Sequence, residues 1–266
     1  MRRSGGQPSP RLMPTNQHIR SIPPINSHVW AFSIGGLVRH PLILSYADLL
    51  RQPSVTLPVS VICTDRRSLD SAHYTGVPLS ALFDLVELRE GAQFVTMHAY
   101  DGYTSVLRLD DLREQAYIAY AIDGQPLTHE QGAPARLVIP GRYGYKLPKW
   151  ITRLEATEQA ISGTWEKRGF DRDGQLNAVV EITTHETLAD GQIRLYGFAY
   201  SPTETLDMLE IMVDRGLSTR FPLSGTYWQV DWMPPYPNGN FRFEAAVGTR
   251  RQGRLALVRQ HYLIRT

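Results

Sequence analysis

The first 170 residues combine two periods of hydrophobic residues, that of a helix and that of strands. Apolar residues recur at i, i+3, i+4 and i+7 within 78–89, which predicts an amphipathic helix. A shorter helix is predicted over 45–51, where Ser45 is a favourable N-cap. Strand composition predicts five further elements, at 28–36, 56–63, 94–100, 104–109 and 135–140. This part of the chain is therefore predicted to be a mixed α+β domain.

The pattern changes after Gly174, where almost every segment has strand composition and turns recur about every 10 residues. Seven strands are predicted, at 179–184, 193–200, 209–213, 219–223, 227–232, 241–247 and 255–264. Seven is the strand count of an immunoglobulin-like sandwich, so this part is predicted to be all-β. The predicted organisation is a flexible arm over 1–15, the mixed domain over 16–170 and the sandwich over 176–266.

Composition and charge exclude several classes of protein. The chain has 266 residues, 42% of them hydrophobic, and its 28 basic and 26 acidic residues give a net charge of +2. Without a block of like charges, a protein that binds nucleic acid through phosphate contacts is disfavoured. No apolar run reaches the roughly 18 residues of a membrane span, and the N-terminus lacks the apolar segment of a secretory signal. We expect a cytoplasmic protein, or a periplasmic one if an export signal has been removed.

Cys63 is the single cysteine, so an internal disulfide and a CxxC site are both excluded. It ends an apolar predicted strand and precedes a polar run that contains Arg66 and Arg67. Nearby guanidinium groups stabilise a thiolate, which would suit a catalytic thiol paired with one of the histidines. Residue statistics alone favour an inert buried cysteine instead.

Two of the three lysines in the chain, Lys146 and Lys149, directly follow a glycine-rich stretch, with Arg136 and Arg142 upstream. Glycines let a backbone approach a ligand closely, and fixed positive charge suits an anion such as a phosphate. Neither the GxxxxGK[ST] loop nor the GxGxxG fingerprint is present. Taken alone, this segment is more typical of a solvated basic turn.

Several motifs agree in order and spacing with one known family, and they lie at 34–38, 42–49, 61–63, 74–79, 100–103, 123–127, 132–136 and 144–150. Together they closely resemble the molybdopterin-binding domain of the sulfite oxidase family. The resemblance runs from about residue 16 to residue 169. The seven-strand part resembles the immunoglobulin-like domain that follows in that family, with 197–201 and 213–216 as weaker markers.

The resemblance implies a pyranopterin dithiolene (molybdopterin) that carries molybdenum, with Cys63 as the protein thiolate on the metal. It also implies that Arg66 and Arg67 hold an oxyanion beside the metal. The positions that match the cofactor-binding residues of the family are Arg20, Asp101, Gln131, Arg136, Lys146, Leu147 and Lys149.

The chain departs from the family pattern at several of these positions. Gln131 stands where sulfite oxidases tend to have histidine, and Tyr74 stands where tryptophan is common. Leu147 and Pro148 replace a small polar residue and its neighbour, so Leu147 can offer only its backbone. The segment after Cys63 is one residue shorter, which weakens the match of the arginine pair and with it the substrate assignment.

The resemblance predicts an enzyme that transfers an oxygen atom to or from a small sulfur compound, with oxidation of sulfite to sulfate favoured. The alternatives are a sulfoxide reductase of the same family and a non-catalytic binding protein. No haem or zinc motif is present, so a separate electron carrier is expected. A homodimer is a further prediction, through a buried apolar patch for which Tyr227, Trp228 and Trp232 are candidates. Trp228 and Trp232 have the spacing of one strand face, so they are expected in the core or in this interface.

Overall fold

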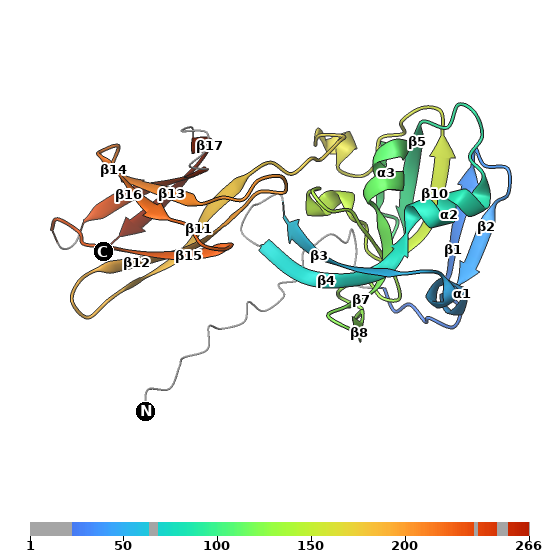
Figure 1. The fold of residues 1–266 in the computed structure, drawn as a ribbon, viewed down its shortest axis with the longest axis horizontal. Helices are drawn as coiled ribbons and strands as arrows, with labels where there is room; N and C mark the ends of the chain where they lie inside the picture. Colours follow the sequence, from blue (N-terminus) through green and yellow to red (C-terminus); the bar gives the residue numbers. More distant parts are fainter. Residues whose placement is uncertain (1–22, 64–68, 237–238, 249–254, 266) are drawn as a thin grey trace. The chain divides into compact units, whose positions relative to one another are not determined.

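The computed structural model describes residues 23–63, 69–236, 239–248 and 255–265. The chain divides into two compact units, Met1–Gln175 (unit 1) and Leu176–Thr266 (unit 2) (Figure 1). Strands dominate both units and the helices of unit 1 are few and short, so unit 1 is mostly β rather than an even mixture of helix and strand. Among the described residues, no helix has the length and apolar character needed to cross a membrane.

The first sheet of unit 1 has five strands in the order β2-β1-β10-β5-β6. Their bounds are β1 (Ala31–Gly36), β2 (Leu42–Ser45), β5 (Phe94–Ala99), β6 (Thr104–Arg108) and β10 (Ile151–Thr157). β10 pairs parallel with β1 and antiparallel with β5, so a strand from late in the unit occupies the centre of the sheet. A Cβ on Gly36 would lie 2.2 Å from the carbonyl oxygen of Ala156, so this contact requires glycine.

The second sheet of unit 1 is antiparallel and has the order β3-β4-β7-β8, with β9 paired to β7. Its strands are β3 (Val55–Ile62), β4 (Leu69–Pro78), β7 (Tyr117–Ile122), β8 (Gln125–Pro126) and β9 (Arg136–Val138). β3 and β4 form a long hairpin, and Ile62 pairs with Leu69 at its tip. This pairing places Cys63, the residue after Ile62, at the tip of the hairpin.

The described helical segments of unit 1 are α1 (Tyr46–Arg51), α2 (Leu79–Val86), α3 (Leu109–Gln115) and the 3₁₀ turns η1 (Gly144–Lys146) and η2 (Glu166–Arg168). The predicted N-cap is confirmed, because the Ser45 hydroxyl accepts a hydrogen bond from the Asp48 N–H at 3.1 Å. The predicted amphipathic helix is confirmed as α2, whose buried face consists of Leu79, Leu82, Phe83 and Val86.

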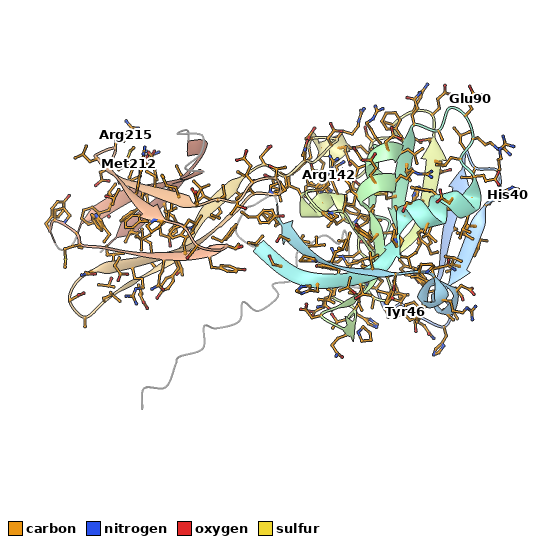
Figure 2. The ribbon with its side chains drawn as sticks, viewed as in Figure 1. His40, Tyr46, Glu90, Arg142, Met212 and Arg215 are labelled. Carbon is orange, nitrogen blue, oxygen red and sulfur yellow. The ribbon has the colours of Figure 1, made fainter. Side chains whose placement is uncertain are left out.

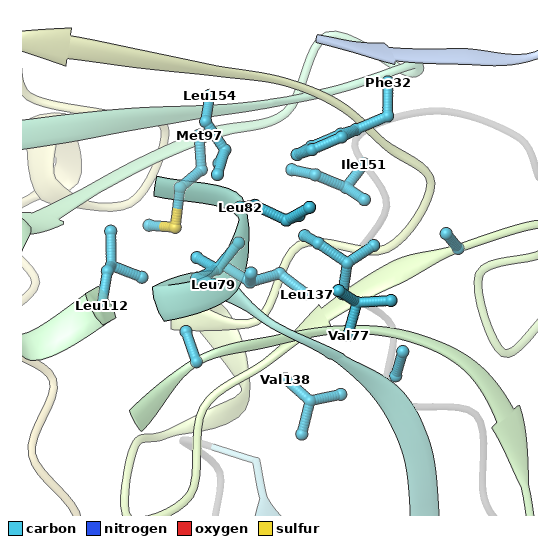
Figure 3. Packing of buried hydrophobic residues seen from close by; sticks show 14 of the residues in the cluster. Phe32, Val77, Leu79, Leu82, Met97, Leu112, Leu137, Val138, Ile151 and Leu154 are labelled. Atoms are coloured by element: carbon cyan, nitrogen blue, oxygen red, sulfur yellow. The ribbon is translucent and has the colours of Figure 1, made fainter. Parts of the chain in front are cut away.

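The hydrophobic core of unit 1 joins α2 to both sheets. Figure 3 shows Leu79 and Leu82 of α2 among Met97 of β5, Leu154 of β10 and Leu137 of β9. Each of these side chains is fully buried, and burial of a leucine contributes about 1.5–3 kcal/mol to folding. The core therefore holds β9 and β10, the strands on either side of the glycine- and lysine-rich segment, in fixed positions.

Unit 2 contains a three-stranded sheet, β11-β12-β15, and a four-stranded sheet, β14-β13-β16-β17. The strands are β11 (Val179–Thr187), β12 (Ile193–Tyr200), β13 (Met208–Val213), β14 (Ser218–Pro222), β15 (Tyr227–Trp232), β16 (Asn240–Gly248) and β17 (Leu255–Arg265). Each of the seven predicted strands is present, and residues from both sheets share one hydrophobic core.

Trp228 and Trp232 belong to the core of unit 2, which is one of the two locations expected for them. Trp228 is buried in the core, and Trp232 packs edge-on against Phe241 and Phe243 at 4.8 and 5.1 Å between ring centroids. Tyr227 alternates with Trp228 along β15 and is 47% exposed. The two tryptophans therefore stabilise the sandwich and leave Tyr227 as the exposed member of the three.

Candidate functional site

Arg136 lies on β9 with a buried side chain that is only 3% exposed. Its guanidinium donates to the carbonyl oxygens of Gln131 at 3.1 Å and Leu147 at 3.5 Å, and Cζ lies 5.8 Å from the centroid of the Tyr74 ring. Within the described part of the chain, the buried Nε has no hydrogen-bond partner. A buried cation is stable only when it is well compensated, so this guanidinium is suited to an additional anion.

Gln131 holds the turn that presents its carbonyl oxygen to Arg136. The Gln131 side-chain oxygen accepts a hydrogen bond from the Thr128 N–H at 2.9 Å, and the Gln131 N–H donates to the Thr128 hydroxyl at 3.2 Å. The turn is closed further by a hydrogen bond from the Ala133 N–H to the Thr128 carbonyl at 3.0 Å. The Gln131 side chain therefore orders this turn, and its backbone orients the arginine.

Gly132 lets the side chains of Arg136 and Lys149 approach the same point. A Cβ at Gly132 would lie 3.0 Å from Cβ of Lys149 and 3.2 Å from Cβ of Arg136, and its φ of +108° also favours glycine. Lys149 is 4% exposed, and its ammonium donates to the carbonyl oxygen of Glu130 at 2.7 Å. Two buried cationic side chains thus flank one glycine.

Leu147 contributes to this group through its backbone, because its side chain is fully buried in the core and its carbonyl accepts from Arg136. The backbone around it is held by a hydrogen bond from the Leu137 N–H to the Pro148 carbonyl at 2.9 Å. The Ile151 N–H donates to the Ala135 carbonyl at 3.1 Å. The segments around Arg136 and Lys149 are therefore fixed to one another.

Lys146 has a different environment from Lys149, although it is only three residues away. Its side chain is fully buried, and its ammonium forms an ion pair with Glu166 and donates to the Val106 carbonyl at 3.1 Å. Burial lowers the pKa of Lys146 from its ordinary value, while the hydrogen bond that its ammonium donates to Glu166 opposes that shift. Arg142, labelled in Figure 2, is likewise paired with a carboxylate, that of Asp111 on α3 at 3.0 Å.

Cys63 and Asp101 lie on other elements of unit 1. Cys63 is half-buried and directly follows β3 at the end of the β3–β4 pairing. Asp101 lies in the turn between β5 and β6, where its carboxylate accepts a hydrogen bond from the Tyr103 N–H at 3.0 Å. This turn was predicted from the pair Asp101 and Gly102, and Gly102 has the positive φ of +86° that such a turn requires.

Three predicted site residues, Arg20, Arg66 and Arg67, lie outside the described residues, and their roles stay predictions. Within the described ranges, no group of three or more His, Cys, Asp or Glu side chains is arranged to hold a metal ion.

Two residues matter more in the structure than the sequence indicates. Tyr74 was noted only as a departure from tryptophan, yet its ring lies against the Arg136 guanidinium. Glu166, the partner of Lys146, was not singled out at all, and its 20-residue separation from Lys146 leaves no local signal. An aromatic residue at position 74 could have been related to the buried arginine, since guanidinium groups stack on aromatic rings.

The group formed by Gln131, Gly132, Arg136, Leu147 and Lys149 fits a cofactor that carries a phosphate. Its chemistry consists of two buried cations, backbone carbonyls and an Arg136 Nε–H still available as a donor among the described contacts. Charge-assisted bonds from arginine and lysine are the strong interactions of phosphate sites. The residues present therefore fit the anionic end of a pyranopterin.

Comparison with known proteins identifies a family and several relatives. The family model described as "Oxidoreductase molybdopterin binding domain" matches residues 19–165. The uncharacterized oxidoreductase YuiH of Bacillus subtilis is 34% identical over 146 residues, which are 54% of this chain and 74% of YuiH. A putative protein-methionine-sulfoxide reductase subunit, YedZ1 of Azospira oryzae, is 29% identical over 148 residues, or 55% of this chain and 56% of that protein.

Other relatives are much longer than the region they share with this chain. The NADPH nitrate reductase of Fusarium oxysporum is 27% identical over 249 residues, and the match covers 72% of this chain but 28% of that enzyme. Among solved structures, the sulfane dehydrogenase SoxCD from Paracoccus pantotrophus matches with a TM-score of 0.70 at 20% identity. That match covers 87% of this chain and 69% of the other, and it establishes a shared fold.

The family match decides the class of protein to which this chain belongs. The match over 19–165 includes more than half of the 266 residues, and it contains Cys63, Arg136 and Lys149. The chain therefore belongs to the oxidoreductase molybdopterin-binding family, as its resemblance to sulfite oxidases predicted, and it is a molybdenum- and molybdopterin-dependent oxidoreductase.

Proposed function

We propose that this oxidoreductase transfers an oxygen atom to or from a small sulfur compound, with oxidation of sulfite to sulfate as the favoured reaction. In that direction, sulfite and water give sulfate, two protons and two electrons. The electrons pass to a separate carrier, because the chain has no haem motif. The names of two similar proteins, a sulfane dehydrogenase and a putative methionine-sulfoxide reductase subunit, support sulfur chemistry.

The observation that carries the proposal is the buried cation group around Gly132. Arg136 and Lys149 would hold the phosphate of the pyranopterin, and Tyr74 and the Gln131 carbonyl would orient the guanidinium. Cys63 would present its thiolate to the metal from the tip of the β3–β4 hairpin. When bound, the molybdenum–pyranopterin group supplies the two-electron redox chemistry, while the protein supplies orientation and charge.

Metal and pterin analysis tests the cofactor part of the proposal. Protein produced in a host that makes the cofactor should contain molybdenum, and it should release a pterin that fluoresces after oxidation. A thiolate ligand should add charge-transfer absorption that disappears in Cys63→Ser. Identical absorption and metal content in the wild type and Cys63→Ser would show instead that Cys63 is not a ligand.

Arg66 and Arg67 are proposed to bind the substrate oxyanion, because they follow Cys63 directly in the chain. Loss of a charge-assisted, desolvated contact weakens transition-state binding by about 2–4 kcal/mol, or roughly 30- to 1000-fold in kcat/KM. Arg66→Gln combined with Arg67→Gln should therefore raise KM for sulfite steeply at unchanged molybdenum content. An effect below about tenfold would remove these arginines from the substrate site.

Sulfoxide reduction is the second candidate, favoured by the 29% identity to the putative methionine-sulfoxide reductase subunit. A sulfoxide is neutral and takes up two electrons and two protons to give a sulfide and water. The same double arginine variant should then change turnover by less than about tenfold, with weak dependence on ionic strength. Sulfite oxidation and sulfoxide reduction, assayed side by side with artificial electron carriers, distinguish the two reactions.

Unit 2 is proposed to be an immunoglobulin-like sandwich with a role in dimer formation. The strand order of its two sheets, β11-β12-β15 and β14-β13-β16-β17, supports a Greek-key sandwich. In this order the fourth strand of the unit, β14, pairs with the third, β13. Exposed apolar side chains such as Tyr227 and Leu263 support an interface. Sedimentation at micromolar concentration should show a dimer, and a 30.1 kDa monomer would exclude it.

A further inference from the structure

The segment that follows β10 returns to β6 and is fixed there by its backbone. The Thr164 N–H donates to the Thr104 carbonyl at 2.8 Å, and the Thr104 N–H donates to the Thr164 hydroxyl at 3.0 Å. A Cβ on Gly163 would lie 2.5 Å from the Thr104 carbonyl oxygen, so the two backbones are in close contact. Glu166 comes two residues after Thr164, and this contact places its carboxylate against Ser105 and Val106 of β6.

The Glu166 side chain is 3% exposed, and one of its oxygens accepts several hydrogen bonds. Oε1 accepts from the Lys146 ammonium, from the Ser105 hydroxyl at 2.9 Å and from the Val106 N–H at 3.3 Å. Lys146 is the cation that forms an ion pair with this carboxylate among the described residues. The charge on Glu166 is therefore compensated by one lysine from the cofactor-binding segment.

The Lys146 side chain is surrounded by protein groups at both its ammonium and its aliphatic stem. The ammonium is bound by Glu166 and by the Val106 carbonyl, and it lies 5.3 Å from the centroid of the Tyr145 ring. A Cβ on Gly174 would lie 2.6 Å from Cγ of Lys146, so backbone also covers the stem of the lysine. Because protein groups occupy these positions around the ammonium, Lys146 has less room to bind an anion.

The enclosed lysine begins the segment that carries the buried cation group. The Leu147 N–H donates to the Gly144 carbonyl at 3.0 Å and completes η1, and the Leu147 carbonyl then accepts from Arg136. Lys149 follows two residues later. Any movement of Lys146 would therefore displace both the carbonyl that orients Arg136 and the backbone of Lys149.

We propose that Lys146 and Glu166 form a positioning pair that holds the Leu147–Lys149 backbone in place for the cofactor, and that Lys146 does not itself bind the phosphate. The inference rests on the cofactor site proposed above, and it is independent of the substrate. It assigns different roles to two lysines of one motif: Lys149 binds the anion, and Lys146 holds the backbone in position.

A double-mutant cycle tests this assignment, with Lys146→Met, Glu166→Gln, the two combined, and Lys149→Met as the matched control. The measurements are molybdenum and pterin content, the rate of pterin loss on dilution, and the Tm of cofactor-free protein. Each single change at the pair leaves a buried charge uncompensated, so it should lower Tm and speed pterin loss about tenfold. The combined variant removes both charges, so its rate of pterin loss should return to within about twofold of the wild-type rate, and its Tm should recover most of the loss.

Lys149→Met should speed pterin loss about 30-fold or more while the Tm of cofactor-free protein changes little. Failure of the combined variant to retain pterin, despite a recovered Tm, would show that the Lys146 ammonium contacts the phosphate. Unchanged pterin retention in Glu166→Gln with a lowered Tm would reduce the pair to a purely structural role. If the Lys149→Met variant retains pterin as the wild type does, the cofactor site itself is misplaced and the proposed function fails with it.

Discussion

Among the described residues, unit 1 has four buried cationic side chains, those of Arg136, Arg142, Lys146 and Lys149, whereas unit 2 has none. Arg194 of unit 2 forms a two-pronged ion pair with Asp231 on the outer surface, at 2.6 and 2.8 Å. Arg142 and Lys146 are paired with carboxylates, but the contacts of Arg136 are two carbonyls and an aromatic ring. Burial of positive charge among the described residues therefore distinguishes unit 1 from unit 2.

The largest effect is expected from removal of a buried charge in unit 1. Arg136→Met should weaken cofactor retention about 30-fold or more, because it deletes a desolvated contact to the phosphate. Arg194→Met is the matched control in unit 2, and its exposed ion pair should leave both Tm and molybdenum content unchanged. Molybdenum content of the two purified variants gives the comparison. Equal losses would mean that the contrast between the units has no bearing on cofactor binding.

Gly132→Ala should cost about 1–3 kcal/mol and also release cofactor, because the position combines a positive φ with crowding by Lys149 and Arg136. Gly225→Ala in unit 2 is the matched control, with φ of +90° and no atom within 4 Å of the added Cβ. It should carry only the backbone penalty and keep its cofactor. Urea unfolding with pterin analysis measures both variants, and full cofactor retention in Gly132→Ala would contradict the close approach of the two cations.

The Tyr74 ring should make a moderate contribution through Arg136. Tyr74→Leu removes the cation–π contact, which is worth about 0.5–2 kcal/mol, so cofactor dissociation should become about 2- to 30-fold faster. Tyr74→Trp keeps an aromatic face and should retain the cofactor at least as well as the wild type. Tyr74→Phe controls for the hydroxyl. Similar dissociation rates in the leucine and tryptophan variants would show that the ring does not support the arginine.

The smallest effect concerns the outer face of the first sheet. Burial lowers the pKa of His98 below its usual 6.5, against an opposing interaction with Glu155 at 3.4 Å. As pH falls, His98 is therefore protonated in the unfolded chain before it is protonated in the folded one. The folded state loses stability relative to the unfolded state below about pH 6.5 and is unaffected by His98 above it. Tm should decrease slightly more between pH 7 and 5 in the wild type than in His98→Gln. Identical pH dependence would exclude this contribution.

Local pattern predicted the elements whose signal lies within a few residues. Helix α2 has four apolar residues on one face, and the strands of unit 2 alternate and are separated by turns, so both were predicted. Strand β4 and helix α3 were not among the predicted elements. β4 carries a polar sequence and is formed by pairing with β3 and β7, while α3 buries only Leu109 and Leu112. Such elements depend on partners that local periodicity does not contain.

The family could be predicted from the sequence alone, because glycines, lysines and the single cysteine lie along the chain in a recognisable order. The sequence could not distinguish Lys146 from Lys149, since both are lysines of one short motif. Tertiary structure decided that Lys146 meets Glu166 and Lys149 lies beside Gly132 and Arg136. The physical reason is that the environment of a buried charge is set by groups brought together through folding, and here the carboxylate comes from 20 residues along the chain.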